Sequence, residues 1–234
     1  MKLSRERRSG KAIKGSQFQL QNIVNKNPAS LNQRILGAST TLRSVISGDI
    51  TWVSPLEKEN YIEYQDKEVL EAIGYPQLKN KLFKFWPEGG PVWDALARFK
   101  LKSSSRHGVI LLEAKSHIEE LENKKGCGAK GKSRQLIVDT FETVQKDLQV
   151  IPNPDWTDIY YQYANRIAHL YFLSVVQKMP AWLVFLYFLN DKQMGGPKEK
   201  SEWDAALTTV KDNLHLPNKH VLSDNIINIF YALK

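Results

Sequence analysis

The sequence has a single cysteine, Cys127, among its 234 residues. One thiol excludes an intramolecular disulfide framework and a cysteine-rich zinc site, and it fits a reducing compartment such as the cytoplasm. No apolar run approaches the ~20 residues needed to span a bilayer, and the best candidate, residues 181–189, has the length of a strand. The basic N-terminus lacks the apolar segment of a secretory signal. We therefore expect a cytoplasmic protein with no membrane partner.

The chain also lacks internal repeats and long low-complexity linkers, so its length suits one large domain. Hydrophobic residues make up 42% of the sequence, which is enough for a sizeable core. Residues 1–28 are basic and polar, and we expect a weakly ordered arm there. Residues 29–234 are expected to form a single α/β domain.

Basic side chains outnumber acidic ones, giving a formal net charge of +8. A basic protein suits a polyanionic partner, because contacts to phosphates release condensed counterions. One basic block lies in the N-terminal arm, and the favoured interpretation there is solvated surface. A second block, residues 124–134, interleaves glycines with lysines.

The pattern of apolar residues predicts the order of the elements. Helical spacing is expected in the four segments 31–47, 56–74, 133–149 and 155–178, with a further helix at 201–214. Two short strands, 92–99 and 108–115, flank a polar loop and predict a hairpin. The run 181–189 is apolar on both faces, as in a strand covered by helices on both sides; residues 220–233 remain a strand or a helix. The expected fold is a mixed central sheet with helices on both faces and an extra helical N-terminal region.

Charged residues stand at the end of the second hairpin strand, where Glu113 and Lys115 are two residues apart. Residues at that spacing on a strand share a face. If the loop centres between Ser103 and Ser104, the antiparallel register places Asp94 opposite Glu113. Opposed carboxylates repel unless a cation lies between them. The oxygen-rich trio suits a hard divalent ion such as Mg²⁺, and the alternative is a salt-bridged strand end without activity.

The segments "GGPVWDALARFK" and "GVILLEAK" resemble the PD-(D/E)XK nuclease superfamily, which has the restriction-endonuclease-like core. Its pattern is an Asp after a turn, a variable gap, and Glu/Asp-x-Lys on the next apolar strand. Here Trp93 precedes Asp94, where the superfamily name has a proline. The likeness covers roughly residues 55–190. Longer stretches around these motifs also resemble a family of small bacterial proteins with this core.

The resemblance implies specific roles for the motif residues. Asp94 and Glu113 would bind Mg²⁺ or Mn²⁺ together with the backbone carbonyl of Ala114, and Lys115 would position or deprotonate the attacking water. Many members add an acidic residue from the helix before the hairpin. The candidate here is Glu63, with Glu71 and Asp66 as alternatives.

Residues 126–133, "GCGAKGKS", match the phosphate-binding loop of nucleotide triphosphatases literally. That loop requires a buried strand ending at its first glycine, whereas the preceding residues are charged. Asp191, after an apolar run, is only a weak partner for it. The favoured alternative is a mobile loop that grips a phosphate backbone. The candidate phosphate contacts are Lys130, Lys132, Arg134 and Gln135, with His117 as a further candidate for the phosphate or the metal.

Polar residues also interrupt the predicted helix 155–178. Asn165, Arg166 and His169 either face the site or, for Arg166, form an ordinary surface charge. The tyrosines nearby are more typical of a core than of a base-stacking surface.

The sequence thus predicts a metal-dependent nuclease that acts on nucleic acid, on DNA rather than RNA. Two alternatives remain: a catalytically silent nucleic-acid-binding or interaction protein on the same scaffold, and a nucleotide triphosphatase using residues 126–133. Nucleases that act on duplexes often pair, so a homodimer is left open.

Overall fold

A computed structural model gives the fold of the chain and describes residues 8–233. A five-stranded mixed sheet lies at its centre in the order β1-β4-β5-β6-β7. The first three strands are antiparallel, and β5, β6 and β7 are parallel to one another. Their bounds are Ile46–Ser54 (β1), Ala95–Leu101 (β4), Ser104–Lys115 (β5), Ala181–Leu189 (β6) and Ile226–Ala232 (β7). A separate pair joins β2 (Tyr64–Gln65) to β3 (Val92–Trp93).

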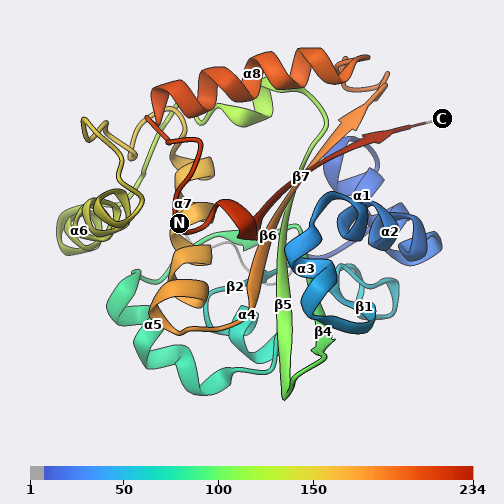
Figure 1. Cartoon of the computed structure of the whole chain (residues 1–234). Coiled ribbons are helices and arrows are strands. Elements are labelled where there is room, and N and C mark those ends of the chain that lie inside the picture. The colour runs from blue at the N-terminus through green and yellow to red at the C-terminus, as the bar shows by residue number, and fades with distance from the viewer. Residues whose placement is uncertain (1–7, 234) are drawn as a thin grey trace.

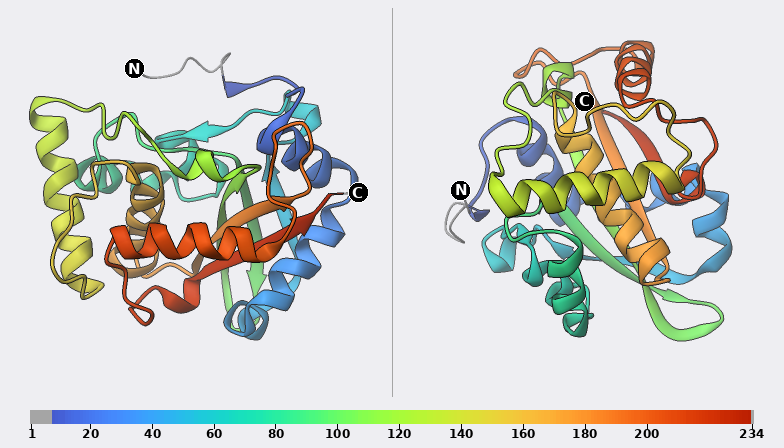
Figure 2. Two further views of the ribbon diagram at one scale, coloured as in Figure 1. Left: turned by 90° about the horizontal axis from the view of Figure 1, so that it is seen from above. Right: turned by 90° about the vertical axis from the view of Figure 1, so that its left-hand side faces the viewer.

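Helices cover both faces of this sheet, as Figures 1 and 2 show. One face carries three N-terminal helices: α1 (Gly15–Lys26), α2 (Pro28–Ala38) and α3 (Thr40–Val45). The other face carries α4 (Lys67–Ala72), α5 (Lys79–Phe85), α6 (Gly131–Asp147), α7 (Tyr161–Tyr171) and α8 (Lys200–Asn213). Two apolar clusters, one on each face, form the core. The predicted α/β class with helices on both faces is confirmed.

Strand β6 shows why the sheet is buried. Each of its residues from Ala181 to Phe188 is buried, because β5 and β7 flank it and helices cover both faces. The burial of strand β5 changes along its length. Ser104, Ser105 and Arg106 are exposed, whereas Gly108 to Lys115 are buried. The hairpin therefore projects its turn into solvent and buries its far end, where the charged residues lie.

The N-terminal region is more ordered than the sequence predicts. Residues 15–26, expected to belong to a weakly ordered arm, form α1, whose Leu20, Ile23 and Val24 are buried. The spacing of these apolar residues was the missed signal, since glutamines and asparagines dilute it. Residues 1–7 of the predicted arm lie outside the described part of the chain.

Two predicted helices are wrong as single elements. The segment 31–47 is divided into α2 and α3 at Ser39, whose Oγ accepts a hydrogen bond from the Leu42 amide and begins a new helix. The segment 56–74 contains an α-helix only at α4, and a 3-10 turn (Glu57–Glu59) and β2 precede it. Elsewhere the differences are smaller. Helix α7 begins at Tyr161 and continues as a π-helical segment, Phe172–Val176, and the last element is the strand β7.

Candidate active site

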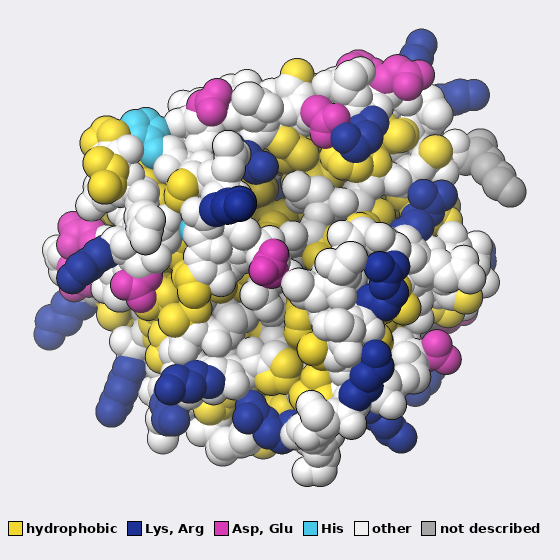
Figure 3. Space-filling view, in the orientation of Figure 1, with side chains coloured by type: hydrophobic (Ala, Val, Ile, Leu, Met, Phe, Trp, Pro, Cys, Tyr) yellow, Lys and Arg dark blue, Asp and Glu magenta, His cyan; other side chains and the backbone are white. Residues whose placement is uncertain are grey.

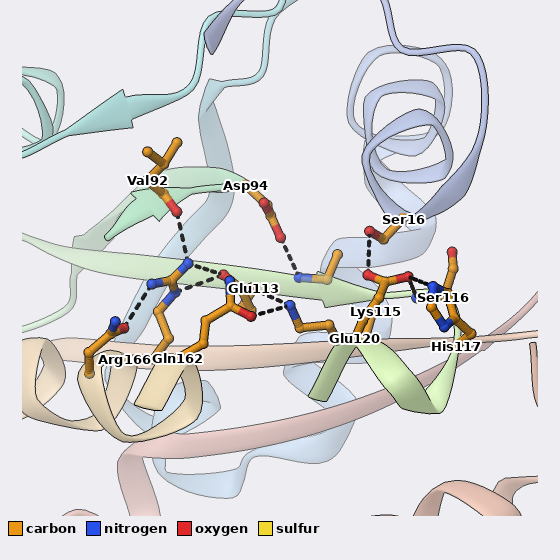
Figure 4. A network of polar contacts seen from close by, with 12 residues as sticks. Ser16, Val92, Asp94, Glu113, Lys115, Ser116, His117, Glu120, Gln162 and Arg166 are labelled. Atoms are coloured by element: carbon orange, nitrogen blue, oxygen red, sulfur yellow. Dashed lines mark hydrogen bonds and ion pairs between the residues drawn. The ribbon is translucent and has the colours of Figure 1, made fainter. Parts of the chain in front are cut away.

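The hairpin of β4 and β5 has the predicted register. Ala95 pairs with Leu112 and Lys100 with His107, which is the pairing expected from a turn centred between Ser103 and Ser104. Asp94 lies one residue before β4, and its Oδ2 accepts a hydrogen bond from the Ala114 amide at 2.8 Å. The Asp94 carboxylate therefore lies against the backbone of β5, beside Glu113 (Figure 4).

Glu113 is buried and engages two cations. Its Oε1 accepts from Lys115 Nζ at 2.7 Å, and its Oε2 accepts from Arg166 Nε at 2.7 Å. Arg166 also donates to the Val92 carbonyl at 2.9 Å, which ties it to β3. Burial opposes ionisation of Glu113, but the two cations outweigh it and hold the pKa of the carboxyl below its usual value. Glu113 is thus a carboxylate with both oxygens paired.

Lys115 has a second partner, because its Nζ donates to Gln162 Oε1 at 2.8 Å. Gln162 and Arg166 are four residues apart on α7, so both project from the same face toward β5 (Figure 4). The sequence leaves open whether Arg166 faces the site or the surface, and the structure shows it buried in the site. Gln162 was missed; the only available signal was its position one helical turn before Arg166.

Three carboxylates interact electrostatically in this region. Burial raises the pKa of Asp94 well above its usual value, and the negative charges of Glu113 and Glu63 add to that effect. Burial likewise raises the pKa of Glu63 to about 7, again with a contribution from Glu113. Two of the three acids are therefore held where a proton or another cation is favoured.

Glu63 lies in the loop before β2, not on a helix as the resemblance implies. Its Oε1 accepts a hydrogen bond from Gln17 Nε2 on α1 at 2.8 Å. The segment before α1 adds a second tie, since Arg8 donates to the Glu63 carbonyl at 2.9 Å. The N-terminal region, expected to be weakly ordered, thus holds one of the candidate acids in place.

The two alternative acids have other tasks. Asp66 accepts hydrogen bonds from the amides of Gly89 and Gly90 at 3.0 and 2.9 Å, which shapes the turn before β3. A Cβ at Gly90 would lie 3.1 Å from Asp66 Oδ1 and 3.2 Å from His169 Nε2, so the turn packs closely against both side chains. Glu71 is exposed on α4. Glu63 is consequently the better third acid.

The chemistry of these donors fits a hard divalent cation such as Mg²⁺. Asp94 uses one carboxylate oxygen for the Ala114 amide, and no described residue donates to the other. Asp94 as a whole residue is partly buried. However, no three His, Cys, Asp or Glu side chains among residues 8–233 form a ready set of metal ligands. Glu113 is turned toward Arg166 and Lys115.

The predicted phosphate contacts do not join this group of residues. Arg134 donates to Thr157 Oγ1 at 2.9 Å and to the Cys127 carbonyl at 3.3 Å, so it fastens the loop before α6. Gln135 donates to Asp139 on its own helix. Lys130 and Lys132 are exposed at the start of α6, which lies in an outer layer beyond α7 (Figure 1).

His117 likewise has a local partner, because its Nε2 lies 3.2 Å from Glu120 Oε1. Glu120 in turn accepts from the Ser116 amide and from Ser16 on α1 (Figure 4). This arrangement ties α1 to the end of β5. It matches the interpretation of His117 as a histidine at a strand-to-helix junction.

The motif at residues 126–133 lacks the context of a nucleotide-binding loop. Helix α6 does begin within it, at Gly131. The preceding strand, β5, ends at Lys115, and residues 122–130 form turn and coil. Asp191, the weak partner for such a loop, is buried and accepts from Ser116 Oγ at 2.8 Å.

The other polar and aromatic residues of α7 belong to the core. Burial lowers the pKa of His169 to about 3, and its Nδ1 lies 2.8 Å from the Asn165 carbonyl. Tyr163 stacks on Phe185 with ring centroids 4.4 Å apart. The interpretation of the tyrosines as core residues agrees with the burial of Tyr160, Tyr163 and Tyr171.

Comparison of the chain with known protein families, with curated proteins and with solved structures produced no match. Across residues 8–233, no helix has both the length and the apolar character required of a membrane span.

Proposed function

We propose that this protein is a metal-dependent nuclease that hydrolyses phosphodiester bonds, in DNA rather than RNA. The observation that carries the proposal is the convergence of Asp94, Glu113 and Glu63 beside Lys115, with the pKa of Asp94 and of Glu63 raised. Crowded carboxylates of this kind favour a divalent cation. The resemblance to the PD-(D/E)XK superfamily and the net charge of +8 add support.

The cation would be Mg²⁺ or Mn²⁺, held by Asp94, Glu113 and the Ala114 carbonyl, with Glu63 near them. When bound, it would polarise a phosphoryl oxygen and lower the pKa of a water ligand.

Lys115 would position the attacking water. An ammonium group has three N–H donors. Lys115 directs one to Glu113 Oε1 and one to Gln162 Oε1, and the third is left over. Because both partners are fixed by strand and helix, the remaining donor has a defined direction toward water or a phosphate oxygen. Gln162 is therefore a positioning residue for Lys115.

The test is cleavage of plasmid, linear duplex, single-stranded DNA and RNA in the presence of Mg²⁺ or Mn²⁺. We expect Asp94→Asn and Lys115→Met each to lower the cleavage rate by about 10²–10³-fold, the scale seen when one group that stabilises a transition state is removed. Asp212→Asn and Lys211→Met, both at exposed positions of α8, are the matched controls. Absence of metal-dependent cutting on every substrate, or cutting that survives both site substitutions, would overturn the proposal.

A catalytically silent protein on the same scaffold is the second candidate. It is favoured by the complete pairing of Glu113, whose two oxygens are taken by Lys115 and Arg166. Calorimetric titration with Mg²⁺ and Mn²⁺ separates the two functions, because a silent scaffold binds neither ion at Asp94. The nucleotide triphosphatase is disfavoured by the missing strand before Gly126. Nucleotide affinity that disappears with Lys132→Ala would revive it.

A further inference from the structure

Exposed cations gather at the turn end of the β4–β5 hairpin and on the neighbouring helix α5. Figure 3 shows Lys and Arg side chains over the lower part of the molecule, where Figure 1 places these elements. The group, called here the basic strip, consists of seven exposed residues: Lys79, Lys81, Lys84, Arg98, Lys100, Arg106 and Lys178. None of the seven forms an ion pair with another described residue.

Contacts between the elements make the strip continuous. Lys81 Nζ on α5 donates to Gln177 Oε1 at 3.3 Å, and Arg106 donates to the Lys178 carbonyl at 3.3 Å. Arg98 reaches the segment that leads into α5, because its guanidinium lies 3.5 Å from where a Cβ on Gly74 would be. Helix α5, residues 177–178 and the hairpin thus present their charges side by side.

The hairpin part of the strip is hollowed. A hollow of about 600 Å³ is lined by Arg98, Lys100 and Arg106, together with the hydroxyl-bearing residues Ser104 and Ser105. One acidic residue, Asp49, also lines it. Arginine, lysine and serine are donors that contact phosphate oxygens in protein–DNA interfaces. An anionic backbone matches both the charge and the donors of this surface.

Arg98 and Lys100 of the strip lie on the same face of the sheet as the candidate site, whereas Arg106, an odd number of residues before Glu113, projects from the other face of β5. Arg98 faces Val109 across the hairpin, and residues 109, 111 and 113 alternate onto one face of β5. Arg106 precedes Glu113 by seven residues, which at roughly 3.3 Å per residue is about 23 Å along the strand. B-DNA rises about 3.4 Å per base pair, so this span is about seven base pairs.

From this placement we propose that the basic strip binds the phosphate backbone of duplex DNA, about one helical turn or less from the bond to be cut. The inference rests on the proposed nuclease function and assigns its substrate contacts to the strip instead of residues 130–135. An anionic membrane surface fits less well, because membrane-binding faces combine cations with large apolar side chains. Among the described residues, one exposed large apolar side chain, Val176, lies next to the strip in sequence.

The test measures binding of a fluorescent 30-base-pair duplex by anisotropy in EDTA, so that no chemistry takes place. One variant replaces Lys79, Lys81 and Lys84 by Gln, and a second replaces Arg98, Lys100 and Arg106 by Gln. The matched control replaces three other exposed lysines by Gln. These are Lys124 and Lys125, in the loop before α6, and Lys132, at the start of α6. Circular dichroism and thermal denaturation establish that each variant is folded.

We expect each strip variant to bind the duplex about 10–100-fold more weakly at 100 mM salt, and the control to bind within about twofold of wild type. Each lost phosphate contact should also lower the slope of log K against log salt by about 0.9. Unchanged affinity of both strip variants, or an equal loss in the control, would overturn the inference. So would a wild-type protein that binds phosphatidylserine vesicles at 50 mM salt but not the duplex.

The inference and the proposed function fail separately. If the strip variants lose duplex binding while Asp94→Asn leaves cleavage unchanged, the strip is a DNA-binding surface and the proposed active site is wrong. If Asp94→Asn abolishes cleavage while the strip variants bind and cut like wild type, the nuclease proposal is supported and the proposed role of the strip in DNA binding is wrong.

Discussion

Arg166 Nε donates to Glu113 Oε2 at 2.7 Å, and the two side chains form a buried ion pair with 4% and 2% of their surfaces exposed. The Arg166 guanidinium neutralises the Glu113 carboxylate, which the proposed function assigns to the metal. Under the proposed function, Arg166 and the metal would compete for Glu113. An arginine in this place would then stabilise the metal-free protein and weaken its affinity for the ion.

Substitution of Arg166 by Ala should have opposite effects on stability and on the response to metal. In EDTA we expect the free energy of unfolding to fall by about 3–5 kcal/mol, because Glu113 loses one partner of a buried pair. Added Mg²⁺ should then raise the melting temperature of the variant more than that of wild type. Urea unfolding and thermal denaturation, each with and without Mg²⁺, measure both effects.

Arg134→Ala is the control, because Arg134 is exposed and bonds to the Thr157 hydroxyl and a backbone carbonyl, with no carboxylate partner. It should leave the response to Mg²⁺ unchanged. An Arg166→Ala protein that responds to Mg²⁺ no more than wild type would show that Glu113 is not shared between the two cations.

Gln162 offers a second test, since it holds Lys115 without touching a carboxylate itself. We expect Gln162→Leu to lower the cleavage rate constant about tenfold while the KM for duplex DNA stays nearly constant, because the lysine loses its fixed direction. Steady-state kinetics on a linear duplex separate the two constants. Gln135→Leu is the control, because Gln135 bonds only to Asp139 on the surface of α6. Equal losses in both variants, or a loss carried by KM alone, would contradict the positioning role.

The sequence predicted the centre of the fold because its signals there are local. The hairpin register followed from the polar turn at Ser103 and Ser104, and β6 followed from an apolar run too short for a membrane span. Glu113 and Lys115 followed from the two-residue period of a strand, and the structure places them 2.7 Å apart. In each case the decisive residues are within a few positions of one another.

The missed parts depend on contacts between distant segments. Gln17 and Glu63 are 46 residues apart, and Gln162 and Lys115 are 47 apart, so no periodicity could pair them. The phosphate contacts assigned to residues 130–135 followed from nearness in sequence, whereas α6 lies in an outer layer of the fold (Figure 2). The helix expected at 56–74 forms only as α4, because pairing of β2 with β3 and the hydrogen bonds that Asp66 accepts from the amides of Gly89 and Gly90 overrode helical spacing before it.

The hairpin itself makes a prediction about stability. A Cβ on Gly108 would lie 2.1 Å from Phe99 Cζ, because the Phe99 ring covers that glycine across the strands. The same ring packs edge-on against Trp182 with centroids 5.6 Å apart, so it has little room to move. We expect Gly108→Ala to lower the free energy of unfolding by about 2–3 kcal/mol in a urea titration.

The control for this substitution is Gly128→Ala, since no atom lies within 4 Å of the added Cβ. It should change stability by no more than about 0.5 kcal/mol. Gly128 belongs to the phosphate-loop-like motif, whereas the duplex is proposed to bind at the basic strip. The Gly128→Ala variant should therefore also retain duplex binding. A Gly108→Ala protein as stable as the Gly128→Ala control would show that the Phe99 ring is free to shift.

The last prediction concerns pH and follows from the carboxyl of Glu63. Its pKa is raised from 4.5 to about 7 in the folded protein, with burial as the main cause. Between these values the unfolded chain loses the proton first, so the unfolded state gains stability as pH rises. The wild-type protein should therefore lose stability, on the order of 3 kcal/mol, as pH increases from about 4.5 to about 7, and remain at the lower level above that.

Glu63→Gln removes the titrating group and keeps the oxygen that accepts from Gln17. In EDTA, its free energy of unfolding relative to wild type should rise between pH 5 and pH 8, as measured by urea denaturation at each pH. Glu142→Gln, at an exposed position of α6, should follow the wild-type profile throughout. Because deprotonation prepares Glu63 and Asp94 for a cation, the affinity of wild type for Mg²⁺ should increase over the same range. Parallel profiles for Glu63→Gln and wild type would show that Glu63 is already ionised at pH 5, and the crowding of carboxylates that supports a metal site would be lost with it.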